Sequence, residues 1–192
     1  MTKRANSAVP MYYAGIGSRK TPDDVLDCMK VIGYVLAKSG LILRSGAADG
    51  ADSAFESGCD RAGGAKQIFL PWSGFNDRTP DEKSVFSCPS KKAIEMASRT
   101  HPAWHMLVPG AQKLHARNCH QIFGPDVDDV SSASSIVICW TPGAGKGGTE
   151  QALRIAEQFG IKSVNLACFG KQDMLLMAFK SVCELVFVDG GS

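Results

Sequence analysis

Three short segments of the sequence combine glycines with polar side chains, and each of them follows an apolar stretch. They cover residues 15–19, 45–52 and 141–149. Glycine lets the backbone approach a ligand closely, and the free N–H groups at the start of a following helix favour an anion. One such segment is weak evidence, because glycine also simply makes turns, but three of them together predict a site for a phosphate group.

The residues of these segments that we expect to contact the ligand supply a backbone N–H, a hydroxyl or a guanidinium. They are Gly15, Gly17, Ser18, Arg19, Gly46, Gly50, Gly147, Gly148 and Thr149. Carboxylates occur among them as well. Asp49 and Asp52 are candidates to accept hydrogen bonds from ribose hydroxyls or to take part in acid–base chemistry, while Asp49 fits equally well as the cap of the helix that follows.

A predicted helix over residues 111–123 carries polar side chains on its apolar face. Leu114, Asn118 and Gln121 share that face at helical spacing, which indicates either a cavity or ligand beside the helix or hydrogen-bonded buried amides. Arg117 suits a phosphate because its planar guanidinium binds two oxygens at once. The alternative for Arg117 is a salt bridge at the surface.

Histidines and cysteines give no metal-binding pattern. His101 and His105 are four residues apart but lack the glutamate of an H-E-x-x-H motif, and the seven cysteines are scattered without a C-x-x-C pair. No metal and no resident cofactor are therefore expected, and the cysteines are interpreted as reduced thiols in the core of a cytoplasmic protein. His115 is a candidate acid or base because histidine titrates near neutrality, but exposure at the surface is the favoured interpretation.

Two common nucleotide-binding motifs are incomplete in this chain. Gly145 and Lys146 are followed by Gly147 in place of the Ser or Thr of a Walker A loop, so an ATPase of that class is not expected. The dinucleotide-binding pattern G-x-G-x-x-G breaks after Gly17, because Lys20 stands where the third glycine belongs.

The composition is that of an ordinary globular protein. The chain of 192 residues has the length of one domain, and 44% of its residues are hydrophobic and 21% charged. A net charge of +2 does not require a polyanionic partner, although it does not exclude nucleic acid. Residues 1–10 are expected to form a flexible polar arm without a signal peptide, and no apolar run approaches the ~20 residues of a membrane span.

The elements that position the polar residues alternate between strands and helices. Strands are expected at residues 11–14, 41–43, 67–70, 135–140, 163–166 and 185–188, and helices at about 21–38, up to about 62, and at 90–99, 111–123, 150–159 and 172–180. Residues 72–89 show no periodicity and are interpreted as a long loop. This alternation predicts a single α/β domain of Rossmann-like form, with a mostly parallel sheet and helices on both faces.

At the glycine-containing segments the chain resembles the SLOG superfamily. This group contains the Lonely Guy (LOG) cytokinin-activating phosphoribohydrolases, DNA-processing protein A (DprA) and YspA/YpsA-like proteins, and the similarity is closest to small phage and bacterial proteins described as DprA-like. The matching segments are residues 13–19, 45–52, 68–72, 101–104, 113–118 and 139–156. The resemblance implies a Rossmann-like fold with a nucleotide at the glycine loops.

The LOG branch of this group implies a catalytic pair that cleaves the N-glycosidic bond of a nucleoside monophosphate. Its arginine lies in a helix similar to residues 114–118, which makes Arg117 the candidate. Its glutamate belongs to a P-G-G-x-G-T-x-x-E motif. Counted from Pro142 this place falls on Glu150, but counted from the later glycine and threonine it falls on Ala152.

Three functions are compatible with these patterns. The first is an enzyme whose glycine loops hold a 5′-phosphate while Arg117, with Glu150 or Asp49, assists departure of the base. The second is a nucleotide-binding protein without catalysis, which acts as a sensor or sequesters its ligand. The third is binding of single-stranded DNA in the manner of DprA. LOG-type relatives are dimers, so the resemblance also implies a homodimer. Ala47 departs from the family pattern, because relatives commonly carry glycine at this position.

Overall fold

The computed structural model describes residues 10–81, 83–87, 89–143 and 147–188. Residues 1–9 of the expected N-terminal arm, and Gly145 and Lys146 of the third glycine-containing segment, lie outside these ranges.

A six-stranded sheet with all of its strands parallel forms the centre of the molecule. Its strands are β1 (Tyr12–Gly17), β2 (Ile42–Ser45), β3 (Lys66–Leu70), β4 (Val85–Ser87), β5 (Ile136–Trp140) and β6 (Lys162–Asn165). Their order across the sheet is β4-β3-β2-β1-β5-β6, so the chain leaves β1 toward one edge and returns to its other side at β5. This arrangement confirms the predicted α/β class.

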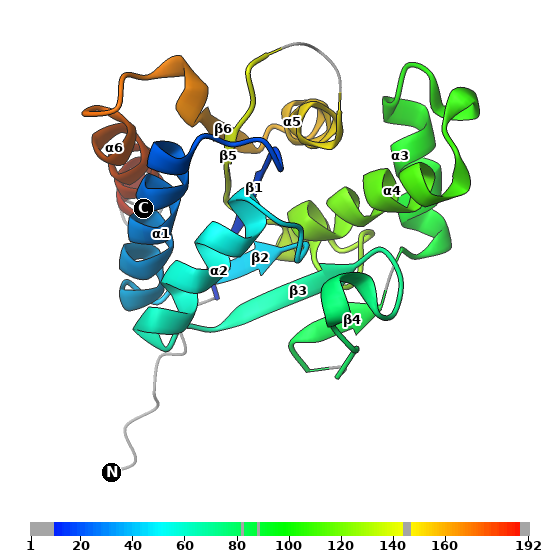
Figure 1. Cartoon of the computed structure of the whole chain (residues 1–192), viewed down its shortest axis with the longest axis horizontal. Coiled ribbons are helices and arrows are strands. Elements are labelled where there is room, and N and C mark those ends of the chain that lie inside the picture. Colours follow the sequence, from blue (N-terminus) through cyan, green and yellow to red (C-terminus); the bar gives the residue numbers. More distant parts are fainter. Residues whose placement is uncertain (1–9, 82, 88, 144–146, 189–192) are drawn as a thin grey trace.

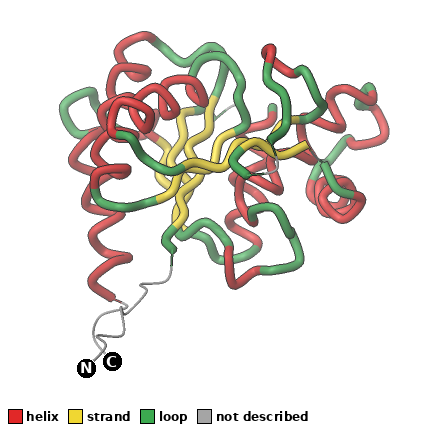
Figure 2. The backbone as a smooth tube through the Cα atoms, turned by 90° about the horizontal axis from the view of Figure 1, so that it is seen from below, coloured by secondary structure: helices red, strands yellow, loops and turns green. Residues whose placement is uncertain are grey.

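Helices cover both faces of the sheet (Figures 1 and 2). The helices are α1 (Asp23–Lys38), α2 (Ala51–Ala62), α3 (Lys91–Thr100), α4 (Pro109–Phe123), α5 (Gly148–Gln158) and α6 (Met174–Val188). The helices α1, α2 and α6 pack on one face, whereas α3, α4 and α5 pack on the other. The central strands β1 and β5 are covered on both sides and almost wholly buried, which explains the apolar runs of the sequence at these two places.

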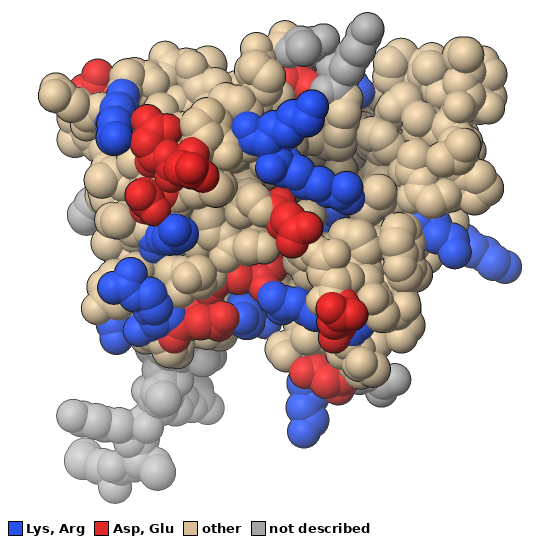
Figure 3. Space-filling view, viewed as in Figure 1, with Lys and Arg blue, Asp and Glu red and all other residues tan. Residues whose placement is uncertain are grey.

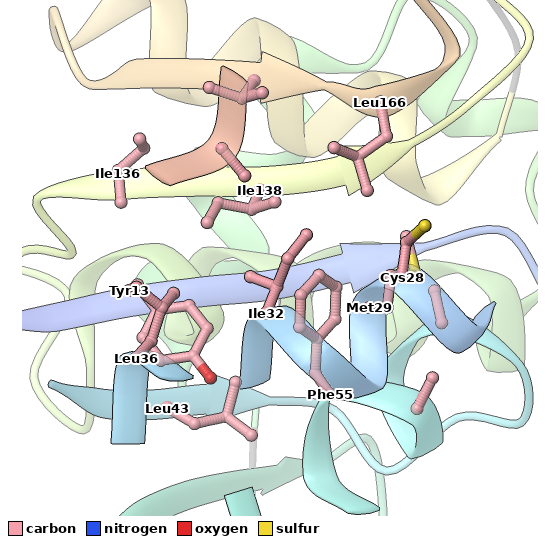
Figure 4. Close-up of a cluster of buried hydrophobic side chains, with 14 of the residues drawn as sticks. Tyr13, Cys28, Met29, Ile32, Leu36, Leu43, Phe55, Ile136, Ile138 and Leu166 are labelled. Atoms are coloured by element: carbon pink, nitrogen blue, oxygen red, sulfur yellow. The ribbon is translucent and has the colours of Figure 1, made fainter. Parts of the chain in front are cut away.

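The alternation of side chains along the strands assigns each strand residue to one of two cores. Tyr13 and Ile138 point to the side of α1 and α2, where Figure 4 shows them among the side chains of those helices. Their neighbours Ala14, Val137 and Cys139 point to the side of α4 and α5. This period of two is the geometry that a strand imposes on successive side chains.

Two sequence-based predictions of secondary structure were wrong. The stretch interpreted as a loop over residues 72–89 contains β4, which pairs with β3 at the sheet edge. The strand expected at residues 185–188 is instead the last turn of α6, which continues without interruption from Met174. The buried side chains of Met174, Ala178 and Val182 recur every four residues, so the apolar stripe of a helix continues toward that point.

Close packing of α1 on α2 predicts a large effect of a small substitution. A Cβ on Gly58 would lie 2.0 Å from the carbonyl oxygen of Lys30 in α1, which is backbone and cannot move without shifting the helix. We expect Gly58→Ala to lower the free energy of unfolding by about 3 kcal/mol, at the upper end of the usual cost of overpacking. Gly110→Ala is the matched control in urea denaturation, since nothing lies within 4 Å of its added Cβ. Equal stability of the two variants would contradict this packing.

Candidate functional site

A cavity of about 450 Å³ lies at the carboxyl ends of β1 and β5, between these strands and α4. Its lining consists of Ile16, Gly17, Ser18, Arg19, Lys20, Ala48, Asp52, Ala111, Leu114, His115, Arg117, Asn118, Gln121, Thr141, Pro142, Gly147, Gly148 and Thr149. The three glycine-containing segments therefore meet at one edge of the sheet, as expected. This edge is also the switch point of the topology, where ligands of open α/β sheets usually bind.

The loop after β1 contributes backbone and two cationic side chains to the cavity. The lining includes Gly17, Ser18, Arg19 and Lys20, of which Lys20 was not among the ligand contacts expected from the sequence. Gly15 has a different role, because it lies inside β1 and a Cβ there would come within 2.7 Å of the Phe55 ring. Gly15 therefore permits packing of the core, and it is not part of the lining.

The turn after β2 is shaped for close approach of another segment. A Cβ on Gly46 would lie 1.0 Å from Nη1 of Arg117, so only glycine leaves room for the guanidinium at this point. Gly50 precedes α2 with a φ of 83°. Ala47, at the position where relatives commonly carry glycine, has a φ of 57°, a left-handed conformation that costs a non-glycine residue roughly 1–2 kcal/mol. Gly46 and Gly50 support the site from outside its lining.

A buried ion pair joins the turn after β2 to α4. Arg117 is only 5% exposed, and its Nη1 lies 3.3 Å from Oδ2 of Asp52. The same carboxylate oxygen accepts hydrogen bonds from the backbone N–H groups of Gly46 and Ala48. Burial raises the pKa of Asp52 to about 6, although the positive charge of Arg117 acts in the opposite direction. The alternative interpretation, in which Arg117 forms a salt bridge at the surface, was therefore wrong.

Two buried donors at the cavity have no hydrogen-bond partner among the residues that the structure describes. They are Nε of Arg117 and Nε2 of Gln121, whose side chain is 1% exposed. Both residues lie on the side of α4 that lines the cavity, so the predicted cavity beside Asn118 and Gln121 is present. Buried donors without a partner are costly, which makes this corner of the cavity favourable for an acceptor atom.

The loop after β5 brings the start of α5 to the cavity. Gly147 precedes the helix with a φ of 102°, and Gly148 and Thr149 form its first turn. Nδ2 of Asn118 donates a hydrogen bond to the carbonyl oxygen of Gly148 at 2.9 Å, which fixes α5 against α4. The first N–H groups of a helix have no partner within the helix and carry partial positive charge, so this end favours an anion.

Two of the carboxylates proposed for acid–base chemistry, Glu150 and Asp49, are not part of the described cavity lining. Oε1 of Glu150 accepts a hydrogen bond of 2.7 Å from the hydroxyl of Thr141. Asp49 is exposed, with Oδ1 3.4 Å from the amide nitrogen of Asn76, and it does not cap α2, whose N-cap Gly50 makes no side-chain bond. The capping interpretation of Asp49 was therefore wrong. Asp52 is the carboxylate that does line the cavity.

His115 is buried, contrary to the favoured expectation of surface exposure. Its side chain lines the cavity, and its Nδ1 makes a hydrogen bond with Oε1 of Gln151 in α5. The ring centroids of His101 and His115 are 4.6 Å apart. Burial lowers the pKa of His115, and the neighbouring positive charges of Arg154 and Arg117 act in the same direction. The imidazole is therefore neutral at physiological pH.

The described ranges contain neither a metal-binding cluster nor a membrane-spanning helix. These residues contain no group of three or more His, Cys, Asp or Glu side chains arranged to hold a metal ion. None of their helices combines the length and the apolar character needed to cross a membrane.

Comparison with known proteins identifies the fold. No protein-family model and no curated protein sequence matches the chain. Among solved structures, DNA processing protein A from Helicobacter pylori, described for its single-stranded DNA binding mode, superposes with a TM-score of 0.54 at 19% identity over 80% of this chain. The Moco carrier protein of Chlamydomonas reinhardtii superposes with a TM-score of 0.51 at 15% identity, over 83% of this chain and 77% of that one.

The chain therefore has a Rossmann-like α/β fold that is similar to the folds of these two proteins. The match covers 64% of the length of the Helicobacter protein, so the likeness extends over part of that protein. At these identities the likeness concerns the fold. This fold places the cavity at the switch point between β1 and β5, where the glycine-containing loops converge.

Proposed function

We propose that the cavity binds the phosphate group of a nucleotide or a nucleotide-like ligand. The observation that carries this proposal is the pair of buried donors, Nε of Arg117 and Nε2 of Gln121, which lack partners at the cavity. A phosphate offers several acceptor oxygens and a charge that complements a guanidinium. Its oxygens are acceptors of the kind that these donors lack.

The charges around the cavity support an anionic ligand. Arg19, Lys20 and Arg117 are cationic lining residues, and the N-terminus of α5 adds the positive end of a helix dipole. Asp52 is the single acidic residue among the described residues of the lining, and Arg117 already pairs with it. The balance of charge therefore favours binding of one or two negative charges.

The rest of the cavity fits the organic part of such a ligand. Apolar surface is contributed by Ile16, Ala111, Leu114 and Pro142. A volume of about 450 Å³ lies within the usual range of small-molecule sites, which is roughly 300–1,000 Å³. Together these features are compatible with a nucleoside monophosphate.

Hydrolysis of an N-glycosidic bond is a second candidate function, with Arg117, Glu150 and Asp49 as the residues first proposed for it. The observation that favours catalysis concerns another carboxylate. Asp52 lies beside Arg117 in the cavity with a pKa of about 6, so it can both hold and release a proton near neutrality. Of the two aspartates considered from the sequence for acid–base chemistry, Asp52 is therefore the better candidate.

Single-stranded DNA, the ligand of the Helicobacter DprA structure, would present the same phosphate and base chemistry to this cavity. On the face drawn in Figure 3, however, basic side chains are interspersed with acidic ones. Extended nucleic-acid sites combine a positively charged groove with aromatic side chains. A small ligand is therefore the favoured proposal, and a homodimer and a cytoplasmic location stay predictions.

Binding is tested by thermal stabilisation and calorimetry with nucleoside mono- and diphosphates, ribose 5-phosphate and inorganic phosphate. We expect Arg117→Lys to reduce affinity roughly tenfold, because lysine keeps a cation near Asp52 but loses the planar fork and its Nε. Arg99→Lys is the matched control, since Arg99 is exposed and pairs with Glu95 on the surface of α3. Release of free base, followed by chromatography, separates hydrolysis from binding alone.

An unchanged melting temperature with every compound of this panel would contradict the proposed function. Equal losses of affinity in the Arg117 and Arg99 variants would contradict the placement of the ligand at Arg117.

A further inference from the structure

The hydrogen bonds of Gln151 fix the position of the proton on the His115 ring. Nε2 of Gln151 donates to the carbonyl oxygen of Ala97 at 3.0 Å, and it lies 3.4 Å from the hydroxyl of Thr100. A carbonyl oxygen can only accept, so the amide of Gln151 must present its nitrogen to Ala97 and its oxygen to His115. Because Oε1 of Gln151 accepts, Nδ1 of His115 carries the hydrogen.

The other ring nitrogen of His115 is consequently an acceptor. A neutral imidazole has one N–H, and a second proton on Nε2 would create a buried cation near Arg117 and Arg154. His101, whose ring is in contact with that of His115, also acts against the second proton. Among the described residues, none donates a hydrogen bond to Nε2 of His115.

This acceptor lies in a cavity whose lining includes several groups that only donate. Side chains that can only donate are those of Arg19, Lys20 and Arg117, and Gln121 adds a donor without a partner. The carboxylate of Asp52 already accepts hydrogen bonds from three N–H groups of the protein. His115 lies one turn of α4 before Asn118, whose amide contacts the start of α5. Three residues of a helix rise about 4.5 Å, and His115 lines the same cavity as Arg117, so His115 lies near the proposed phosphate position.

We propose that Nε2 of His115 accepts a hydrogen bond from a sugar hydroxyl of the bound ligand, so that the site selects phosphate esters of a hydroxylated sugar over phosphate alone. This inference rests on the proposed function, because it assumes that the phosphate occupies the corner near Arg117. His115 is then a specificity-determining residue, and Gln151 is the positioning residue that holds its tautomer.

Two substitutions of His115 distinguish the hydrogen-bonding roles of its two ring nitrogens. The amide of His115→Asn can take the place of Nδ1 and still donate to Gln151, but it does not reach the position of Nε2. The amide of His115→Gln reaches the position of Nε2 and can accept there, but it leaves Gln151 without its donor. The probes are adenosine 5′-monophosphate, its 2′,3′-dideoxy analogue and inorganic phosphate, measured by calorimetry on the full chain at pH 7.5.

We expect the wild type to bind the hydroxylated monophosphate roughly fivefold to tenfold more tightly than the dideoxy analogue, as one hydrogen bond to a neutral group allows. In His115→Asn this preference is lost, whereas His115→Gln retains part of it. The affinity for inorganic phosphate changes less than twofold in both variants. In the wild type, nitrogen chemical shifts of the His115 ring should report the hydrogen on Nδ1.

Other outcomes overturn the inference in different ways. If His115→Asn weakens all three probes equally, His115 has a merely structural role, and the proposed function stands without this inference. If His115→Asn keeps the preference for the hydroxylated ligand, or if the ring carries its hydrogen on Nε2, the inference is wrong. Absence of binding by all three probes to the wild type overturns the proposed function together with the inference.

Discussion

Replacing Gly46 with alanine is expected to lower the affinity for a phosphate ligand roughly a hundredfold while leaving the fold intact. The added Cβ would fall 1.0 Å from Nη1 of Arg117. The φ of Gly46 does not lie in the left-handed region, so the backbone itself tolerates alanine. The conflict is resolved by movement of the guanidinium, which is the far end of a flexible side chain.

The consequence for binding follows from what Arg117 would lose. Displacement removes the guanidinium from Oδ2 of Asp52 and from the corner near Gln121 where the phosphate is proposed. Hydrogen bonds to charged groups contribute about 1.5–3 kcal/mol each, and about 2.7 kcal/mol corresponds to a hundredfold change in affinity. Calorimetric titration with inorganic phosphate measures the loss directly.

Gly110→Ala serves as the control for this experiment, because its Cβ would meet nothing within 4 Å. Circular dichroism of both variants checks that the fold is retained. Wild-type affinity of Gly46→Ala would show that the guanidinium does not need this place, and the phosphate position proposed here would then be wrong.

The glycine-containing loops could be predicted from the sequence because their signal is local. Each follows an apolar strand and precedes a helix, and parallel strands place all such junctions at one edge. The contribution of α4 was predictable for the same reason, since Leu114, Asn118 and Gln121 share a helical face through their spacing alone. Periodicity thus identified the wall of the cavity that carries its polar side chains.

The partners of the charged residues could not be predicted in this way. Arg117 and Asp52 are 65 residues apart in sequence, and His115 and Gln151 are 36 apart. Such pairs form only when separate elements pack, so no short-range pattern encodes them. Residue type gave little guidance, because arginine and aspartate are mostly exposed in proteins. A surface position was accordingly the alternative for Arg117 and the favoured interpretation for His115.

The two wrong elements have equally physical causes. β4 has three residues, from Val85 to Ser87, which is too few for an alternation of apolar and polar side chains to be visible. The end of α6 is rich in valine and phenylalanine, residue types that favour strands. Packing of α6 on α1 outweighs this weak local preference, as tertiary contacts commonly do.

Asp52→Asn is expected to raise the affinity for an anion at pH 7.5 by roughly tenfold or more. Asparagine can place Oδ1 where Oδ2 of Asp52 stands and still accept from Gly46, Ala48 and Arg117. What it removes is a negative charge at the edge of the cavity. For two unit charges about 6 Å apart at an effective dielectric constant near 20, Coulomb's law gives roughly 3 kcal/mol of repulsion.

The same substitution should change how stability depends on pH. Burial raises the pKa of Asp52 from its ordinary 3.8 to about 6 in the folded protein, with Arg117 opposing and Glu56 reinforcing the shift. The folded state therefore holds this proton more tightly than the unfolded state. This tighter binding of the proton adds on the order of 3 kcal/mol to the free energy of unfolding. The contribution is fully present below pH 4 and is lost as the pH rises to about 6. Asp52→Asn should lack this decrease.

Sulfate is the appropriate probe for the accompanying change in affinity, since it keeps two negative charges from pH 5 to pH 8 whereas a phosphate monoester titrates near pH 6. In the wild type, sulfate affinity should rise as the pH falls through 6, because a neutral Asp52 no longer repels the anion. In Asp52→Asn the affinity should be high throughout, and any rise that persists at lower pH belongs to His115 or His101. Identical pH profiles of the two proteins would mean that the titration of Asp52 does not govern the anion site, and the buried pair with Arg117 would then act only in holding α4 to the turn after β2.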